Sequence, residues 1–372
     1  MHATRAMIAA VAIMALAVGV VTTAAPVPAG RTGLVVHEWG TFSSFSGSDG
    51  APLQFYPDGS DLPSFVYSSV RNQKKSIAGT VSLETPVLYF YSDRPMTASV
   101  HADFPTGVFT EWFPQSAVSE PGRSIDWASV RARPGEPGTL PTATGPTHYY
   151  AARDVDAAPL TVVTKVENRE IHENERFLFY RGVGNPKTPL AVTAVGGGTF
   201  SLRATGDAPI AAALVLEVKA GRVRYKNLDP IPTGPAVTAS LPADWSTAEP
   251  VRAALVTTLV RAGLYEKEAR AMVKTWESAW FGEDGTRVLY ILPKDWTDRT
   301  LPLKVTPTPD TLVRVMVGRH DVLTPERERE IEELTRKIDG PDRQEAYAAL
   351  AKLGRFAEPA RAQAEKRLAR RR

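Results

Sequence analysis

Short apolar runs alternate with short polar turns through the middle of the chain, which is the pattern of an antiparallel β domain. Between residues 84 and 241 the runs are rich in Val, Ile, Leu, Phe and Tyr, and the turns contain Pro, Gly, Asn or Asp. In one run, Val100 and Ala102 alternate with His101, as in a half-buried strand. We predict about nine strands, at residues 86–92, 97–104, 107–113, 160–168, 176–182, 189–196, 198–205, 212–221 and 222–228. The expected fold is mainly β, with an antiparallel β-sandwich-like domain over residues 33–241 that begins with an aromatic-rich segment.

Two polar stretches interrupt the predicted strands. Residues 119–145 are rich in Pro and Gly and predict a long surface loop. The segment 167–176 begins like a zinc-protease helix at His172 and Glu173, but Arg176 stands where that motif has its second histidine. We therefore interpret this segment as a polar hairpin loop.

After the β domain, the apolar spacing changes to that of helices. Ser246, with Glu249 three residues later, predicts a capping box at the start of a first helix. A second helix over residues 269–280 carries Trp276 on its apolar face. Further strands are predicted at residues 287–292 and 311–318. Residues 246–323 are therefore expected to form an α+β region.

The last part of the chain, residues 324–372, predicts helices. Thr324 and Pro325 open one helix, and two shorter helices follow on either side of Gly354. This final pair resembles the HEAT-like helix pair of secreted bacterial proteins. Because one such pair cannot bury its apolar face alone, we expect it to dock on its own chain or on a partner.

The N-terminus predicts where the protein works. Arg5 precedes an apolar run over residues 6–21, and small residues follow, as in a secretory signal peptide. We predict a signal peptide over residues 1–25, with cleavage as late as Ala29 as an alternative. An uncleaved membrane anchor is the competing interpretation. Cleavage would leave no membrane span and would place the protein in the periplasm or at the cell exterior.

Cysteine is absent from the chain, which excludes disulfides, lipoprotein anchoring, thiolate catalysis and zinc–cysteine sites. The formal charge is +3, but residues 355–372 hold seven Lys or Arg against two Glu, so the body is slightly acidic. This basic tail suits either anionic lipids and glycans or a solvated helix end. Nucleic acid is not a predicted partner, because basic residues are not interleaved with aromatic ones.

His37 and Glu38 are the candidate catalytic residues, because an adjacent imidazole and carboxylate can act as a base and its partner. Neighbouring residues on a strand point to opposite faces, so the two would converge only at a bulge, which Gly40 could allow. A structural role for both residues is the alternative.

His101 and Asp103 are the candidate metal ligands, since their spacing puts both on one face of a strand. A third ligand would have to come from elsewhere, such as Glu111, His148 or His172. A solvated histidine is the alternative. Calcium is the other metal hypothesis, at three aspartates in glycine-rich loops that are also ordinary turns, Asp49, Asp58 and Asp61.

Trp112, Trp127 and Tyr149 are the candidate ligand-binding residues, because flat aromatic faces with polar edges suit the sugar rings of envelope polysaccharides. They lie in or beside the loop-rich part of the β domain. The competing interpretation is that these side chains fill the core.

Several separated motifs resemble those of a family of exported bacterial proteins. They include HEWGTF at 37–42, ETPVLYFYS at 84–92 and LVRVMVGR at 312–319. The resemblance implies export and a shared fold, and it transfers no activity, substrate or catalytic residue.

These observations favour an exported, envelope-associated binding or structural protein, whose partner would be an envelope glycan or another protein. The alternative is a metal-dependent or carboxylate-based hydrolase outside the cytoplasm, built from His37, Glu38, His101 and Asp103. Whether the protein is an enzyme stays open at this stage, and neither a cofactor nor an oligomeric state is predicted.

Overall fold

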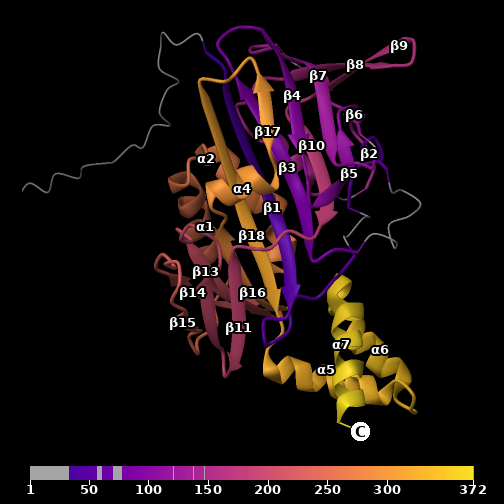
Figure 1. Ribbon diagram of the computed structural model, residues 1–372, viewed down its shortest axis with the longest axis vertical. Helices are drawn as coiled ribbons and strands as arrows, with labels where there is room; N and C mark the ends of the chain where they lie inside the picture. Colours follow the sequence, from indigo (N-terminus) through magenta and orange to yellow (C-terminus); the bar gives the residue numbers. More distant parts are fainter. Residues whose placement is uncertain are drawn as a thin grey trace, which may run out of the picture. The chain divides into compact units, whose positions relative to one another are not determined.

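The computed structural model describes residues 33–56, 61–69, 78–119, 121–136, 138–145 and 147–371. The predicted signal peptide, residues 1–25, lies outside these residues. The described chain is mainly β and ends in helices, as predicted (Figure 1). None of the helices in these residues has the length and apolarity that crossing a bilayer requires.

A nine-stranded mixed sheet forms the centre, in the order β14-β13-β16-β18-β1-β3-β10-β5-β2. Its strands are β1 Val35–Ser46, β2 Tyr67–Ser68, β3 Val81–Tyr91, β5 Gly107–Phe113, β10 Leu178–Gly184, β13 Ala213–Lys219, β14 Arg222–Leu228, β16 Gly285–Ile291 and β18 Thr311–Val322. β1 and β18 pair in parallel along their whole length. The sheet therefore combines strands from the predicted β domain with strands from the predicted α+β region.

Two smaller sheets pack on one face of the central sheet. One contains β4 Met96–Asp103, β6 Ala117–Val118, β7 Ser124–Ala132, β8 Leu160–Val166, β9 Arg169–Glu175 and β17 Leu303–Thr306. The other contains β11 Leu190–Gly196, β12 Thr199–Ala204 and β15 Val237–Ser240. All three sheets contribute to one apolar core, which buries Phe42 of β1, Trp127 of β7 and Phe200 of β12. This packing confirms the predicted sandwich-like arrangement.

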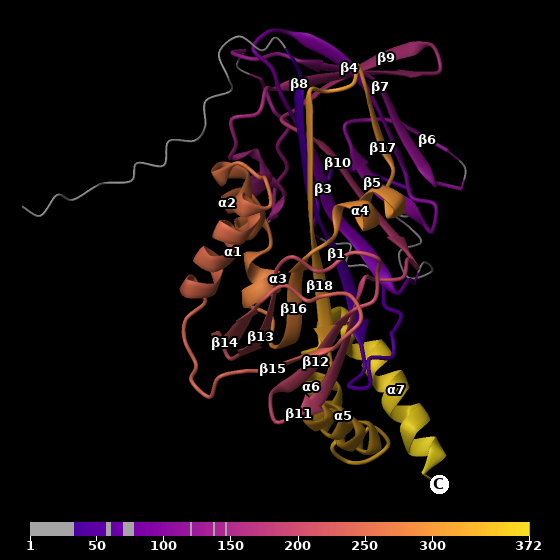
Figure 2. The same cartoon turned by 60° about the vertical axis from the view of Figure 1, so that its left-hand side comes forward.

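Helices cover the opposite face of the central sheet. They are α1 Glu249–Arg261, α2 Glu266–Thr275, α3 Glu277–Phe281 and the 3-10 helix η1 Tyr149–Arg153. Figure 2 shows α1 and α2 on one side of β1, β3 and β18, and β4, β7 and β17 on the other. Trp39 of β1, Val315 of β18 and Met272 of α2 share this second core. A further helix, α4 Lys294–Thr300, follows β16 and precedes β17 along the chain. It buries Trp296 in the first core.

Three C-terminal helices pack around a third, smaller core. They are α5 Pro325–Lys337, α6 Arg343–Ala351 and α7 Ala357–Arg370, with the 3-10 helix η2 Gly354–Phe356 before α7. The Phe356 ring lies 4.4 Å from the ring of Phe45, at the end of β1, and 5.3 Å from that of Phe55, measured between centroids. The helix pair therefore docks on its own chain, which was one of the two predicted alternatives.

The basic tail forms ion pairs within this helical region. Arg367 pairs with Glu328, and Arg371 pairs with Glu332, both on α5. These pairs use two of the charges that binding to anionic lipids or glycans would need.

Three local predictions are wrong. The segment 167–176, predicted to be a polar loop, contributes only a two-residue turn, since Arg169–Glu175 forms strand β9 and pairs with β8. The predicted loop over residues 119–145 contains strand β7, in which Trp127 is fully buried. The strand was not predicted because polar residues separate its inward-facing positions. The predicted capping box does not form, since Ser246 pairs through its backbone with Val223 and Ala248 is the residue that precedes α1.

Replacing Phe356 with alanine should weaken the docking of the C-terminal helices. Phe356 is 7% exposed, and deleting a buried phenyl ring lowers the free energy of unfolding by about 3 kcal/mol. Denaturant unfolding measures the effect, with Tyr347→Ala, at a side chain that is 48% exposed, as the control. An unfolding midpoint for Phe356→Ala equal to that of the control would contradict the docking.

Candidate functional site

The helix-covered face of the central sheet changes from apolar to charged along five neighbouring strands. The apolar part belongs to the second core, whereas the charged part lies toward the C-terminal ends of β1 and β18. The polar side chains are Ser43 of β1, Glu84 of β3, Arg181 of β10, Arg287 of β16, and Arg319 and Asp321 of β18. In the strand register, Arg319 lies opposite Ser43 and Arg287 lies opposite Asp321. All six are buried, and charged side chains are seldom buried unless they are paired. We refer to these six side chains as the ionic row.

A cavity of about 570 Å³ adjoins this ionic row. Its walls come from Trp276 and α3, from the start of β16, from the end of β18, from the start of α5, and from residues 352–356. A volume of this size is typical of sites that bind small organic molecules. We therefore take the cavity as the candidate functional site.

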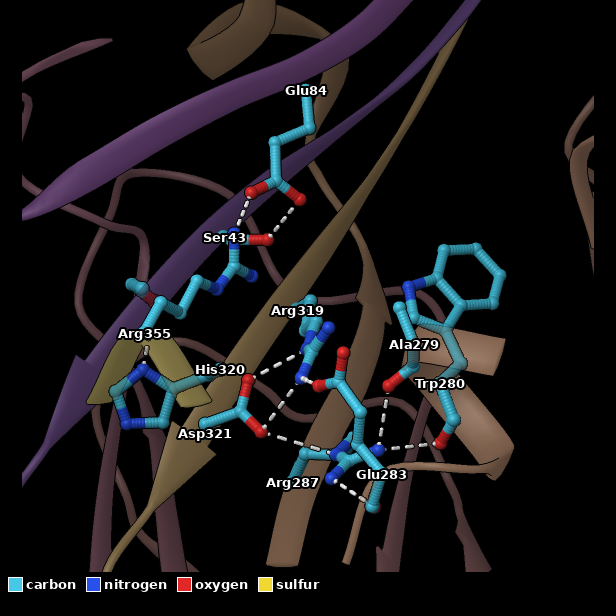
Figure 3. A network of polar contacts seen from close by, with 11 residues as sticks. Ser43, Glu84, Ala279, Trp280, Glu283, Arg287, Arg319, His320, Asp321 and Arg355 are labelled. Carbon is cyan, nitrogen blue, oxygen red and sulfur yellow. Dashed lines mark hydrogen bonds and ion pairs between the residues drawn. The ribbon is translucent and has the colours of Figure 1, made fainter. Parts of the chain in front are cut away.

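Two arginines share Asp321, which lines the cavity, and Figure 3 shows their contacts. Arg319 Nε donates to Asp321 Oδ2 at 2.7 Å, and Arg287 Nε donates to Oδ1 at 3.1 Å. Arg287 also donates to three backbone carbonyl oxygens of residues 279–283, and Arg319 Nη2 donates to Glu283 Oε2 at 2.6 Å. Burial alone would raise the pKa of Asp321, but the charges of the two arginines outweigh it and hold that pKa below its usual value. Burial lowers the pKa of Arg287 to about 10, so this arginine stays charged at neutral pH.

Glu84 connects the sheet to the C-terminal helices. Ser43 Oγ donates to Glu84 Oε2 at 2.7 Å, and Arg355 of η2 pairs with Oε1. The Arg355 guanidinium also lies 5.0 Å from the centroid of the Phe356 ring. Burial would raise the pKa of Glu84, but the Arg355 charge outweighs it and holds the pKa below its usual value. Glu84 is therefore ionised at neutral pH, with both oxygens engaged.

A third ion pair lies at another side of the cavity. Arg181 donates to both oxygens of Asp61, at 2.9 and 3.0 Å. His148 Nε2 lies 3.4 Å from Asp61 Oδ2, and the His148 ring packs against Trp276 at 5.1 Å between centroids. Burial would raise the pKa of Asp61, but the Arg181 charge lowers it far below its usual value.

The predicted catalytic pair, His37 and Glu38, does not come together. His37 Nδ1 lies 2.9 Å from Glu268 Oε2 on the helix-covered face, whereas Glu38 accepts a 2.6 Å hydrogen bond from Arg314 Nε on the other. The β1–β3 register does shift at Gly40, but beyond the pair. Both side chains are buried in separate networks, so the prediction of one catalytic pair is wrong.

The predicted metal ligands, His101 and Asp103, do lie together on one strand face. His101 Nε2 is 3.1 Å from Asp103 Oδ2, and its Nδ1 is 2.7 Å from Asp126 Oδ1 on β7. Each imidazole nitrogen thus faces a carboxylate directly. In the described parts of the chain, no three acidic, histidine or cysteine side chains are arranged to hold a metal ion. His101 is therefore the centre of an ion pair with two carboxylates.

The other candidate metal ligands are dispersed. Glu111 lies on β5 of the central sheet, His148 lines the cavity, and His172 lies on β9 with its Nε2 3.5 Å from Glu170. Of the calcium candidates, Asp49 accepts a hydrogen bond from the backbone of Ala51 and Asp61 pairs with Arg181. Asp58 lies outside the described residues.

The predicted aromatic platform is wrong, because its members point into the protein. Trp112, Trp127 and Tyr149 are 9%, 0% and 1% exposed. Trp127 Nε1 donates to the carbonyl oxygen of Pro114, and the Tyr149 hydroxyl donates to Glu175. On β5 and β7 the alternation of the strand turns both tryptophans toward a core rather than toward solvent.

Arg319 and Asp321 were missed because the predicted strand at 311–318 ends four residues before β18 does. The alternation of β18 continues through Arg319 and Asp321 on the face that carries Val315 and Val317. Two charged residues that continue the buried face of an apolar strand were the available signal.

No protein-family model and no curated protein matches the chain. Among solved structures, the Fcho1 Mu homology domain of Danio rerio with bound Eps15 peptide is 7% identical, with a TM-score of 0.30 over 78% of this chain and 95% of that chain. Two structures of the yeast delta-COP-I mu-homology domain, one complexed with a Dsl1 WxWxV peptide, are 7% and 8% identical, with TM-scores of 0.33 over 78% of this chain and 98% of theirs. Similarity at this level carries no argument about the ligand or the evolutionary origin of the present chain.

His101 should titrate above the 6.5 of an ordinary histidine, since the hydrogen bond with Asp126 raises its pKa more than burial lowers it. At pH values below the ordinary pKa of histidine, the protonated imidazole therefore stabilises the fold. This contribution is lost as the pH rises through the pKa of His101 in the folded state. NMR titration should place the pKa of His101 lower in Asp126→Asn than in the parent protein. Asp93→Asn, at an exposed aspartate, is the control. A pKa at or below 6.5 in the parent protein would contradict the ion pair.

Proposed function

We propose that the protein is an exported, envelope-associated binding protein, and that the cavity beside the ionic row is its ligand site. The observation that carries the proposal is the buried row of ion pairs that adjoins a cavity of about 570 Å³. Arginines and carboxylates held by their partners offer fixed hydrogen-bonding groups, which suit recognition of a small polar ligand.

Export supports the setting of this function. The apolar run over residues 6–21, with Arg5 before it and small residues after it, favours a secretory signal. The resemblance of motifs such as HEWGTF at 37–42 to exported bacterial proteins points the same way. Periplasm and cell exterior are both compatible with this signal.

Binding is favoured over the alternative of a hydrolase. The four residues on which the hydrolase hypothesis depends lie at separate places: His37 and Glu38 on opposite faces of β1, and His101 with Asp103 on another sheet. In the cavity, the carboxylates Asp321, Glu84 and Asp61 are engaged by arginines, which disfavours their use as general bases.

A ligand screen tests the binding site. Soluble envelope glycans and small polar metabolites that bind the purified protein should raise its Tm by a few degrees at concentrations far above Kd. Ser278→Trp, at an exposed position of the cavity wall, should abolish these shifts by filling the space, whereas Thr193→Trp on β11 should preserve them. Ligands that shift both variants equally, or an absence of any ligand response, would contradict the proposed site.

Cell fractionation tests export. The chain expressed with a C-terminal tag should be recovered outside the cytoplasm, and sequencing should find a mature N-terminus after Ala24, Ala25 or Ala29. Replacing Ile13 with arginine should retain the protein in the cytoplasm, because a charge interrupts the apolar run. Cytoplasmic recovery of the parent chain with residue 1 intact would contradict this part of the proposal.

A further inference from the structure

Within the ionic row, the hydrogen-bonding capacity that remains unused belongs to arginines, although exposed carboxylates such as Glu283 and Glu330 also line the cavity. Asp321 accepts three hydrogen bonds from arginines, Glu84 accepts two hydrogen bonds, and Asp61 accepts two. The inner carboxylates are therefore satisfied by the protein itself. A cationic ligand would have to displace one of the arginines, which leaves that arginine buried without its partner.

Two arginines retain unused nitrogens. Nη1 of Arg319 has no partner in the described residues, and the Arg319 side chain, which is 1% exposed, lines the cavity. Arg355 uses Nη1 for Glu84, and no other described residue accepts a hydrogen bond from its guanidinium. Because a guanidinium presents its donors in a planar fork, these nitrogens suit the two oxygens of a carboxylate.

The two guanidinium groups lie near one aromatic ring. The Cζ atom of Arg319 lies 5.9 Å from the centroid of Phe356, and that of Arg355 lies 5.0 Å from it. Arg319 belongs to the sheet and Arg355 to the C-terminal helical region (Figure 3). An anion bound by both groups would therefore connect the sheet to the C-terminal helical region.

The walls of the cavity indicate the rest of the ligand. Lys219 and Lys352 line it, are exposed, and form no ion pair with any residue that the structure describes. Leu353, which is partly exposed, supplies apolar surface, while Ser278 and Glu283 supply polar groups. A ring that bears several hydroxyl groups has both an apolar face and polar edges, and so matches such walls. The volume of about 570 Å³ exceeds what a carboxylate alone would fill.

We infer that the cavity binds a carboxylate-bearing sugar, a uronic acid or a short uronate oligosaccharide, with the carboxylate between Arg319 and Arg355. This inference rests on the proposed function and names the ligand class of the same site. One negative charge is favoured over several, because Asp321, Glu84 and Glu283 already neutralise much of the arginine charge.

Calorimetry on the purified protein tests this inference with glucuronate and its neutral isostere glucuronamide. Glucuronate should bind at one site, with an affinity at least about tenfold higher than that of glucuronamide, because charge-assisted hydrogen bonds are lost in the amide. Inorganic phosphate serves as a third probe and should bind more weakly than glucuronate.

Two variants locate the site. Arg355→Gln should weaken glucuronate binding about tenfold and leave glucuronamide binding nearly unchanged. Because this change leaves Glu84 without its ion-pair partner, the exposed Lys352→Glu variant is measured in parallel and should weaken glucuronate binding several-fold. Lys366→Glu, at an exposed position of α7 away from the cavity, is the matched control.

The outcomes separate the inference from the proposed function. Equal affinities for glucuronate and glucuronamide, or tighter binding of phosphate than of glucuronate, would overturn the carboxylate assignment. The proposed binding site would still stand if other ligands bind the parent protein and Ser278→Trp abolishes their binding. Undetectable glucuronate binding, or full affinity in both Arg355→Gln and Lys352→Glu, would likewise overturn the inference.

Discussion

The parallel pairing of β1 with β18 is the interaction on which the rest of the structure depends. Its register places Val35 opposite Thr311 and Ser46 opposite Val322, so it joins the first described strand to the last. The same register sets Arg319 beside Ser43 and brings Phe45 and Leu323 into the small core on which the C-terminal helices dock. A slip of one residue would turn Arg319 and Asp321 to the other face of the sheet, away from Ser43 and Arg287. The ionic row and the docking surface are thus consequences of one strand register.

Burial of charge explains why this part of the sheet points to a function. Taking an ion out of water costs several kcal/mol, and replacing a buried ion pair with packed apolar residues is often neutral or stabilising. The face of β18 shows that alternative at Val315 and Val317, which pack under the helices just before the face becomes charged. Arg319 and Asp321 then occupy the next two positions on the same face, beside a cavity. A requirement for packing alone would favour continued valines, so the charged positions support the proposed recognition of a polar ligand.

The parts of the structure that depend on local spacing could be predicted from the sequence, and the parts that depend on distant segments could not. Period-two alternation predicted most strands, and it also predicted that His101 and Asp103 share a face while His37 and Glu38 do not. Alternation does not say which face is covered, so the burial of Trp112 was not evident from its strand. The site escaped prediction because Glu84, Arg319 and Arg355 are far apart in the sequence and meet only through sheet register and helix docking.

The central claim is that the unused guanidinium nitrogens beside the ionic row hold a ligand carboxylate. A crystal structure of the protein grown with glucuronate tests it most directly. The account predicts the carboxylate oxygens within about 2.7–3.2 Å of Arg319 Nη1 and of the Arg355 guanidinium, with the sugar ring inside the cavity. A structure in which glucuronate lies elsewhere, or in which protein carboxylates occupy those nitrogens, would contradict it.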